Sequence, residues 1–144
     1  MSIDAFMQAA GQSPDGACGM LNYGDPVVIY DTKAAKWVIL DFAFDPYIPA
    51  PSYFCIAVSD TSDALGTWRS FQMLASSTKL ADYPKLSSTP SGLIISANMF
   101  KNGTSYSGVN VWVLNRNALF SNTPTLQSIL YVLGNAYFSL MPVN

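Results

Sequence analysis

The second half of this chain repeats the first half, displaced by about 56 residues, and this repeat limits what the chain can fold into. Both copies contain an apolar run that ends in Phe, WVILDFAF at 37–44 and LIISANMF at 93–100. A second apolar run follows in each copy, YFCIAVS at 53–59 and VNVWVLN at 109–115. Matching segments at one period predict two equivalent structural units rather than one continuous fold.

Each copy is expected to form four strands. The copies open with an Asp close to a Pro, Asp25-Pro26 and Asp82-Tyr83-Pro84, and they close with TWRSFQML at 67–74 and TLQSILYV at 125–132. The connections are short and rich in Pro, Gly, Asp and Ser, which leaves no room for crossover helices. We therefore predict antiparallel meanders. Four short strands covered on both faces are typical of a β-propeller blade.

The predicted fold class is all-β, with two four-stranded antiparallel propeller blades at 25–81 and 82–137. In the N-terminal segment 1–24, residues 3–8 are interpreted as the outer strand of a preceding blade. Residues 138–144 are interpreted as the first strand of a following blade. Two blades cannot close a ring, because propellers close with about four to eight. The ring is therefore completed either by a homo-oligomer or by sequence missing from this chain.

Composition excludes several classes of protein. Half of the residues are apolar and 11% are charged, which is unlike a disordered chain. A net charge of −2 with scattered basic residues argues against nucleic-acid binding. No apolar stretch reaches the roughly 20 residues that span a bilayer, so no membrane insertion is expected. The N-terminus lacks the pattern of a signal peptide. We expect a cytoplasmic location if the chain is complete, and an extracellular or cell-surface location if it belongs to a longer processed chain.

The chain has no His, and all of its acidic residues are Asp. A Ser-His-Asp triad and a His-containing zinc site are therefore excluded, and two cysteines cannot build a four-thiolate zinc site. Cys18 and Cys55 either form a disulfide or remain as buried free thiols, and the sequence leaves both open. We expect no cofactor, with calcium as the one candidate.

The sharpest local motif is AVSDTSDALGTW at 57–68, in the turn before the fourth strand. Asp63 is expected to accept backbone N–H bonds, Gly66 to adopt a positive φ, and Trp68 to anchor the turn against the blade. The motif resembles the Asp-box turn of sialidase-type propellers, S-x-D-x-G-x-T-W, with one additional residue between Asp63 and Gly66. In that family the turn is structural and lies away from the active face.

Four segments together resemble a group of secreted or cell-surface bacterial β-propeller proteins whose activity is mostly unassigned. The segments are GDPVVIYD at 24–31, CIAVSDTSDALGTW at 55–68, DYPKL at 82–86 and NMF at 98–100. The resemblance covers roughly residues 18–144. It implies a propeller fold and brings no defining catalytic residues. Members of the group are normally longer, with enough blades to close a ring.

In propellers generally, ligands bind the face formed by loops that enter the innermost strands and loops that join the second and third strands. In this chain that face carries the following candidate binding residues: Asp25, Asp45, Tyr47, Asp82, Tyr83, Lys101, Asn102 and Tyr106. Carboxylates beside aromatic rings suit carbohydrate or a hard cation such as calcium. The alternative is that Asp25 and Asp82 fix strand entry by accepting local backbone N–H bonds.

We interpret the chain as a non-catalytic binding or scaffold module with a carbohydrate or protein ligand. The alternative is a glycoside-hydrolase-like propeller in which Asp25 and Asp82 flank the scissile bond, roughly 5–10 Å apart. Against that alternative, the usual Glu acid is absent. A third interpretation is a fragment whose missing blades held the site.

Overall fold

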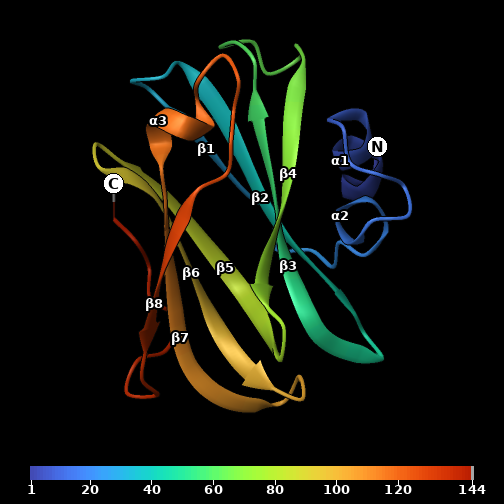
Figure 1. Ribbon diagram of the computed structural model, residues 1–144, viewed down its shortest axis with the longest axis vertical. Helices are drawn as coiled ribbons and strands as arrows, with labels where there is room; N and C mark the ends of the chain where they lie inside the picture. The colour runs from blue at the N-terminus through green and yellow to red at the C-terminus, as the bar shows by residue number, and fades with distance from the viewer. Residues whose placement is uncertain (144) are drawn as a thin grey trace.

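The chain forms two four-stranded antiparallel sheets in the computed structural model, which describes residues 1–143 (Figure 1). The first sheet contains, in order, β1 (Val27–Asp31), β2 (Lys36–Asp45), β3 (Ile48–Ser59) and β4 (Trp68–Ser76). The second contains, in order, β5 (Lys79–Thr89), β6 (Gly92–Lys101), β7 (Ser105–Leu114) and β8 (Ser128–Leu133). Each sheet is a meander, so the all-β class and the two four-stranded sheets are confirmed. The described residues form no closed ring, and the propeller remains a prediction.

Three short helices accompany the sheets: α1 (Ile3–Ala9), α2 (Ala17–Met20) and α3 (Arg116–Leu119). The prediction of an outer strand at 3–8 is wrong. Ile3, Phe6 and Met7 lie at helical spacing and pack as one stripe on the first sheet. The Oγ of Ser2 caps α1 by accepting the Ala5 N–H at 3.2 Å. No helix within residues 1–143 has the length and apolarity needed to cross a membrane.

The C-terminal tail is irregular, so the prediction of a strand at 138–144 is wrong for 138–143; residue 144 lies outside the described residues. The tail lies on the face of the second sheet that points away from the first. Asn98 accepts the Ser139 N–H at 2.8 Å and donates to the Ser139 Oγ at 2.9 Å, and Ser96 donates to the Leu140 carbonyl. Side chains of β5, β6 and β7 thus hold the described part of the tail, and this explains why it is ordered without forming a strand.

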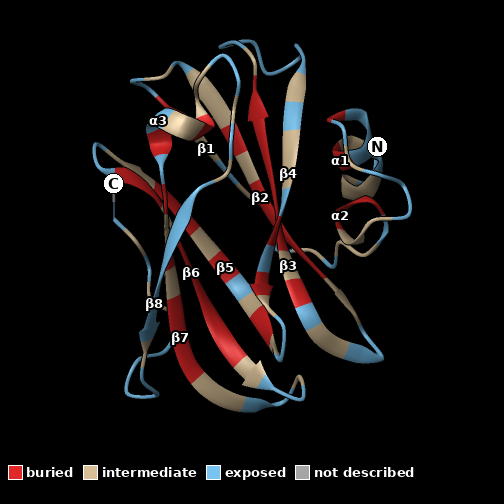
Figure 2. Cartoon of the chain, viewed as in Figure 1, coloured by how far each residue is buried: buried red, intermediate tan, exposed pale blue. Residues whose placement is uncertain are grey.

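The two sheets pack face to face around one hydrophobic core. Alternate residues of the central strands point into it, and these strands are the most buried part of the chain (Figure 2). The ring of Phe54 in β3 meets the ring of Trp112 in β7 edge to face at 4.8 Å. Buried Ser52 donates to the Lys79 carbonyl at 2.8 Å and accepts the Ala81 N–H at 3.1 Å. These bonds join β3 to the start of β5 and align the two sheets.

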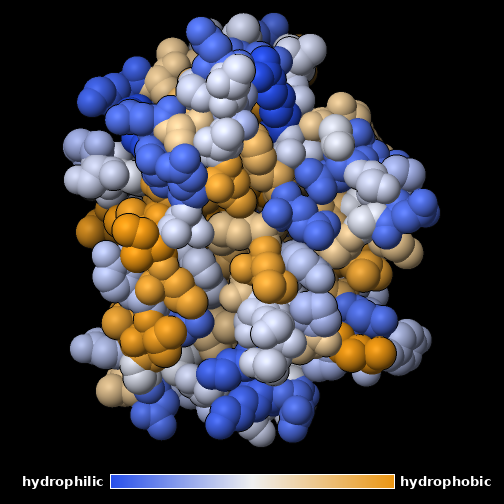
Figure 3. Space-filling view, in the orientation of Figure 1, coloured by the Kyte–Doolittle hydropathy of each residue, from blue (hydrophilic) through white to orange (hydrophobic). Residues whose placement is uncertain are grey.

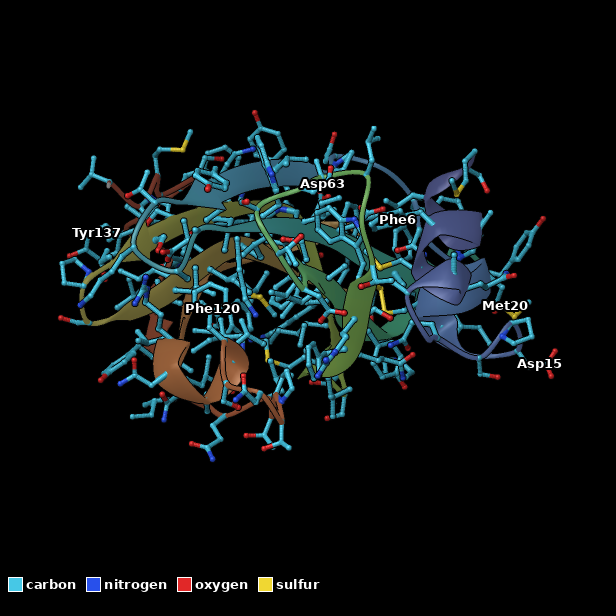
Figure 4. The ribbon with its side chains drawn as sticks, turned by 90° about the horizontal axis from the view of Figure 1, so that it is seen from above. Phe6, Asp15, Met20, Asp63, Phe120 and Tyr137 are labelled. Carbon is cyan, nitrogen blue, oxygen red and sulfur yellow. A yellow bond between two sulfur atoms is a disulfide. The ribbon has the colours of Figure 1, made fainter. Side chains whose placement is uncertain are left out.

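Helices α1 and α2 form a cap on the other face of the first sheet. A second apolar cluster lies beneath the cap, where the ring of Phe6 meets the edge of Trp68 at 5.2 Å. Cys18 of α2 forms a disulfide with Cys55 of β3, and Figure 4 shows this bond between the cap and the sheet. Of the two states that the sequence left open, the structure has the disulfide.

The turn before β4 is held as predicted by Asp63, whose Oδ1 accepts the Leu65 N–H at 2.9 Å. Trp68 donates its indole N–H to the Ala64 carbonyl at 3.1 Å and packs on the cap. The expectation of a positive φ at Gly66 is wrong. A Cβ at this position would lie 3.2 Å from the Asp63 carbonyl oxygen, so Gly66 allows a close approach of the backbone that a larger residue would crowd.

Replacing both cysteines, Cys18→Ala with Cys55→Ala, should lower the free energy of unfolding by about 3–4 kcal/mol, because the disulfide closes a long loop in the unfolded chain. The loop spans 37 residues. Urea unfolding followed by tryptophan fluorescence measures the loss, and the reduced wild type should match the double variant. Hydrogen exchange should rise more in residues 3–20 than in β2 and β3. A loss below about 1 kcal/mol would contradict this role.

Candidate functional site

The loops predicted to form a ligand-binding face lie together at one end of the molecule. Most of the candidates come from loops and strand ends of both sheets: Asp25, Asp45, Tyr47, Lys101, Asn102 and Tyr106. Asp82 and Tyr83 lie inside β5, where the register of this strand with β6 shifts. The β6–β7 turn lies against the start of β3, since a Cβ at Gly103 would lie 2.9 Å from the Cγ of Pro49. In each meander, the turn after the second strand emerges beside the start of the first. The structure therefore groups these loops, and ligand binding by them remains a prediction.

Two of these residues mark the same backbone feature in both sheets. Asp25 and Tyr83 each precede a Pro, and both adopt the left-handed conformation, with φ of 56° and 53°. Asp tolerates this conformation, whereas a bulky residue such as Tyr rarely does. In backbone conformation, Asp25 of the first repeat therefore corresponds to Tyr83 of the second. The sequence comparison matched Asp25 with Asp82, which is one residue too early.

Two carboxylates of this end bind local backbone. The Oδ1 of Asp45 accepts the Tyr47 N–H at 2.8 Å, and the Oδ1 of Asp82 accepts the Tyr83 N–H at 2.8 Å. The ammonium of Lys85 lies 3.0 Å from the centroid of the Tyr83 ring and holds that ring in place. As the alternative predicted, the carboxylate of Asp82 accepts a local backbone N–H, but it lies inside β5, at the shift in register with β6, and not at the entry of the strand. The glycosidase interpretation remains an untested alternative.

The remaining candidates have separate surroundings. The side chain of Tyr47 is 92% exposed. Asn102 has φ of 50°, as expected of an Asn-Gly turn. Tyr106 anchors the C-terminal tail: its hydroxyl donates to the Tyr137 carbonyl, and its ring packs against Phe138 at 5.2 Å. The structure thus assigns Tyr106 a structural contact.

One shallow hollow of about 280 Å³ opens at this end, and Asp45 is its charged lining residue. Its other lining residues are mainly apolar: Ala17, Leu21, Phe44, Ile48, Ala50, Pro51 and Tyr53. Among residues 1–143, no group of three or more Cys or Asp side chains is arranged to hold a metal ion. Calcium binding therefore remains a prediction without a located site.

The opposite end carries a buried ion pair that the sequence did not predict. Arg116 at the start of α3 contacts both carboxylate oxygens of Asp31 at the end of β1, with an Nε–Oδ2 distance of 2.8 Å. Ser88 at the end of β5 donates to Asp31 as well, and the Ala34 N–H does so at 2.7 Å. The pair links the two sheets and lines a cavity of about 290 Å³. Asp31 and Arg116 lie 85 residues apart in sequence, and no local pattern connects them.

The surroundings of this pair stabilise its charges. Burial alone would raise the pKa of Asp31, but the hydrogen bonds from Arg116, Ser88 and Ala34 and the charge of Arg116 hold that pKa well below its usual range. The hydrogen bond to Asp31 in turn raises the pKa of Arg116. The ion pair therefore connects the two sheets, and each charge is neutralised by the other.

A second buried carboxylate, Asp41, has no cationic partner among residues 1–143. It lies in β2 beneath the cap, opposite Cys55 of β3, and is 0% exposed. One of its oxygens accepts the Phe42 N–H at 2.8 Å, and within the described residues the other has no partner. Burial raises the pKa of Asp41 to about 7; the Phe42 N–H opposes the rise, and the charges of Asp25 and Asp4 add to it. In the sequence, this buried carboxylate is indicated by the single charged residue, Asp41, inside the apolar run WVILDFAF.

The outer strand β8 presents an exposed apolar surface. Its register with β7 places Ile129 and Tyr131 on one face of the sheet and Leu130 and Val132 on the other. The exposed fractions of these four side chains are 62%, 51%, 47% and 70%. Figure 3 shows apolar side chains gathered over β8 and the adjoining C-terminal tail. The sequence predicted a fourth strand within 125–132, and the structure places it at Ser128–Leu133.

The corresponding outer strand of the first sheet, β4, is covered. The Ser70 N–H of β4 bonds to the Ala10 carbonyl at 2.8 Å, and the Gln72 Oε1 accepts the Cys18 N–H at 3.2 Å. Arg69 adds a charge to this strand. Residues 10–18 therefore shield the edge of β4, whereas β8 pairs with β7 alone among the named strands.

Comparisons with protein-family models, with curated proteins and with solved structures found no match for this chain. The resemblance to bacterial β-propeller proteins therefore remains a prediction.

Arg116→Ala should lower the free energy of unfolding by about 3–5 kcal/mol, because it leaves Asp31 buried without its partner. Arg69→Ala is the control, since its ion pair with Asp60 is partly exposed and should contribute less than about 1 kcal/mol. Asp31→Leu with Arg116→Met should recover most of the loss. Because the pKa of Asp31 is lowered, the stability from this pair is present above about pH 4 and is lost as the pH falls below it. Denaturant titration at several pH values checks these outcomes, and equal losses for Arg116→Ala and Arg69→Ala would contradict them.

Asp41→Asn should make the protein more stable at pH 8 by up to about 4 kcal/mol, because the wild type must bury a charge there. A raised pKa means that the folded state retains a proton that the unfolded state loses. Wild-type stability should therefore fall between about pH 4 and pH 7, and the variant should lack this fall. Thermal unfolding at half-unit pH intervals measures both slopes. Parallel slopes for the two proteins would rule out the buried carboxylate as the cause.

Proposed function

We propose that this chain is a non-catalytic binding or scaffold module and that it joins a protein partner through the free edge of β8. The observation that carries the proposal is an uncharged outer strand with four large, half-exposed apolar side chains. Exposed, apolar edge strands are normally avoided in soluble proteins because they pair with other chains. An edge of this kind is expected where pairing is the function.

Strand addition matches the chemistry that β8 offers. An incoming extended segment would bond to the outward N–H and C=O groups of β8, and its alternate side chains would meet the apolar side chains on each face. Four charged residues at the two ends of the molecule already have partners within the chain. Asp31 and Arg116 bind each other, Asp45 accepts a backbone N–H in a turn, and Asp82 accepts one inside β5. These contacts support a binding role over a catalytic one.

The proposal includes a secreted or cell-surface location, as the resemblance implies. The disulfide Cys18–Cys55 supports it, because disulfides persist mainly in oxidising compartments. The two blade-like meanders support membership of a larger propeller assembly.

A panel of extended ten-residue peptides with alternating apolar residues tests the binding role by fluorescence anisotropy. We expect wild-type protein to bind members of the panel with micromolar affinity and Val132→Lys to bind at least tenfold more weakly, because an edge lysine opposes strand addition. Leu74→Lys is the matched control, since Leu74 lies on the outer strand of the first sheet and is 53% exposed. Absence of peptide binding, or equal weakening by both variants, would contradict the proposal.

A further inference from the structure

We propose that the partner at β8 is a second copy of the same chain, joined by antiparallel pairing of the two β8 strands. This inference rests on the proposed function and names its partner. The pairing would join the two second sheets into one continuous eight-stranded sheet across a two-fold axis, which is the commonest symmetry of soluble oligomers.

The apolar sequence of β8 is compatible with pairing to a second copy of itself. A two-fold axis perpendicular to the sheet keeps each face on its own side, so residues of like parity stand opposite each other. With the axis at Tyr131, Tyr131 faces its counterpart, Leu130 faces Val132, and Ile129 faces Leu133. Every one of these pairs is apolar, and no like charges oppose. Aromatic and β-branched cross-strand pairs of this kind stabilise antiparallel sheets.

The first sheet supplies the internal comparison. Its outer strand β4 is covered by residues 10–18 of the same chain and carries Arg69, and both features oppose edge pairing. The second sheet has the same meander, but within the described residues its outer strand carries neither charge nor cover. A dimer through β8 would cover this open edge.

The exposed surface suits a weak, reversible dimer. Four large side chains, each roughly half exposed, offer on the order of 400–500 Å² of apolar surface per copy. Edge pairing covers only part of this surface, because the side chains stand on the two faces of the sheet, so the dimer would bury less than roughly 800–1,000 Å² over both copies, below the standard size of specific interfaces. We expect dissociation at concentrations of roughly 10–100 µM.

Sedimentation velocity of the purified chain from about 1 to 500 µM tests this inference, since that range brackets the expected dissociation constant. Wild type should shift from monomer to dimer. Tyr131→Lys and Tyr131→Glu should each remain monomeric, because the substitution places like charges directly opposite each other at the axis. An equimolar mixture of the two variants should form a heterodimer, since the opposed charges then attract. Leu74→Lys should dimerise as the wild type does, and circular dichroism should show that all variants are folded.

Three outcomes would overturn the inference: a wild type that stays monomeric at all concentrations, dimers that both Tyr131 variants retain, or variants that fail to complement. The peptide experiment separates this failure from failure of the proposed function. A monomer that still binds extended peptides through β8 keeps the binding role and excludes the second copy as partner. A chain that neither dimerises nor binds peptides loses both.

Discussion

Burial of alternate side chains of β2, β3 and β6 between the two sheets is the interaction on which the rest of the structure depends. A four-stranded meander with one dry face gains stability at about 25 cal/mol for each Å² of apolar surface that it removes from water. Phe54 against Trp112 and the bonds of Ser52 set the relative position of the sheets. The packing leaves the outer face of each sheet and the edges of β4 and β8 to be covered by the remaining parts of the chain or left exposed.

Different segments cover the outer faces and edges of the two sheets. The first sheet has a cap that is fastened by the disulfide and also shields the edge of β4. The second sheet has an irregular tail, held by Ser96 and Asn98, that covers a face and leaves the edge of β8 open. The repeat therefore produced two similar sheets with different surroundings, and the difference locates the proposed interaction surface.

The two buried aspartates show how surroundings decide chemistry when charges are few. Asp31 has Arg116, a hydroxyl and a backbone N–H, so its pKa is lowered and its charge supports the fold. Asp41 has one backbone N–H and two negative neighbours, so its pKa rises to about 7 and its charge opposes the fold near neutral pH. The same residue type thus stabilises one end of the molecule above about pH 4 and weakens the region beneath the cap as the pH rises to about 7.

Apolar runs and turn residues determined the strands, their antiparallel order and the division into two sheets, because these features depend on neighbouring residues. The Asp63 turn is local in the same way and was predictable. Tertiary packing decided the rest. The helix at Ile3–Ala9 is stabilised by packing its apolar stripe on the face of the first sheet. The disulfide Cys18–Cys55 depends on the same packing, which brings α2 next to β3. The contact between Asp31 and Arg116, and the exposure of β8 against the cover of β4, depend on which segments meet in space. Contacts between residues that are distant in sequence leave no periodic pattern in that sequence, so only the tertiary structure determines them.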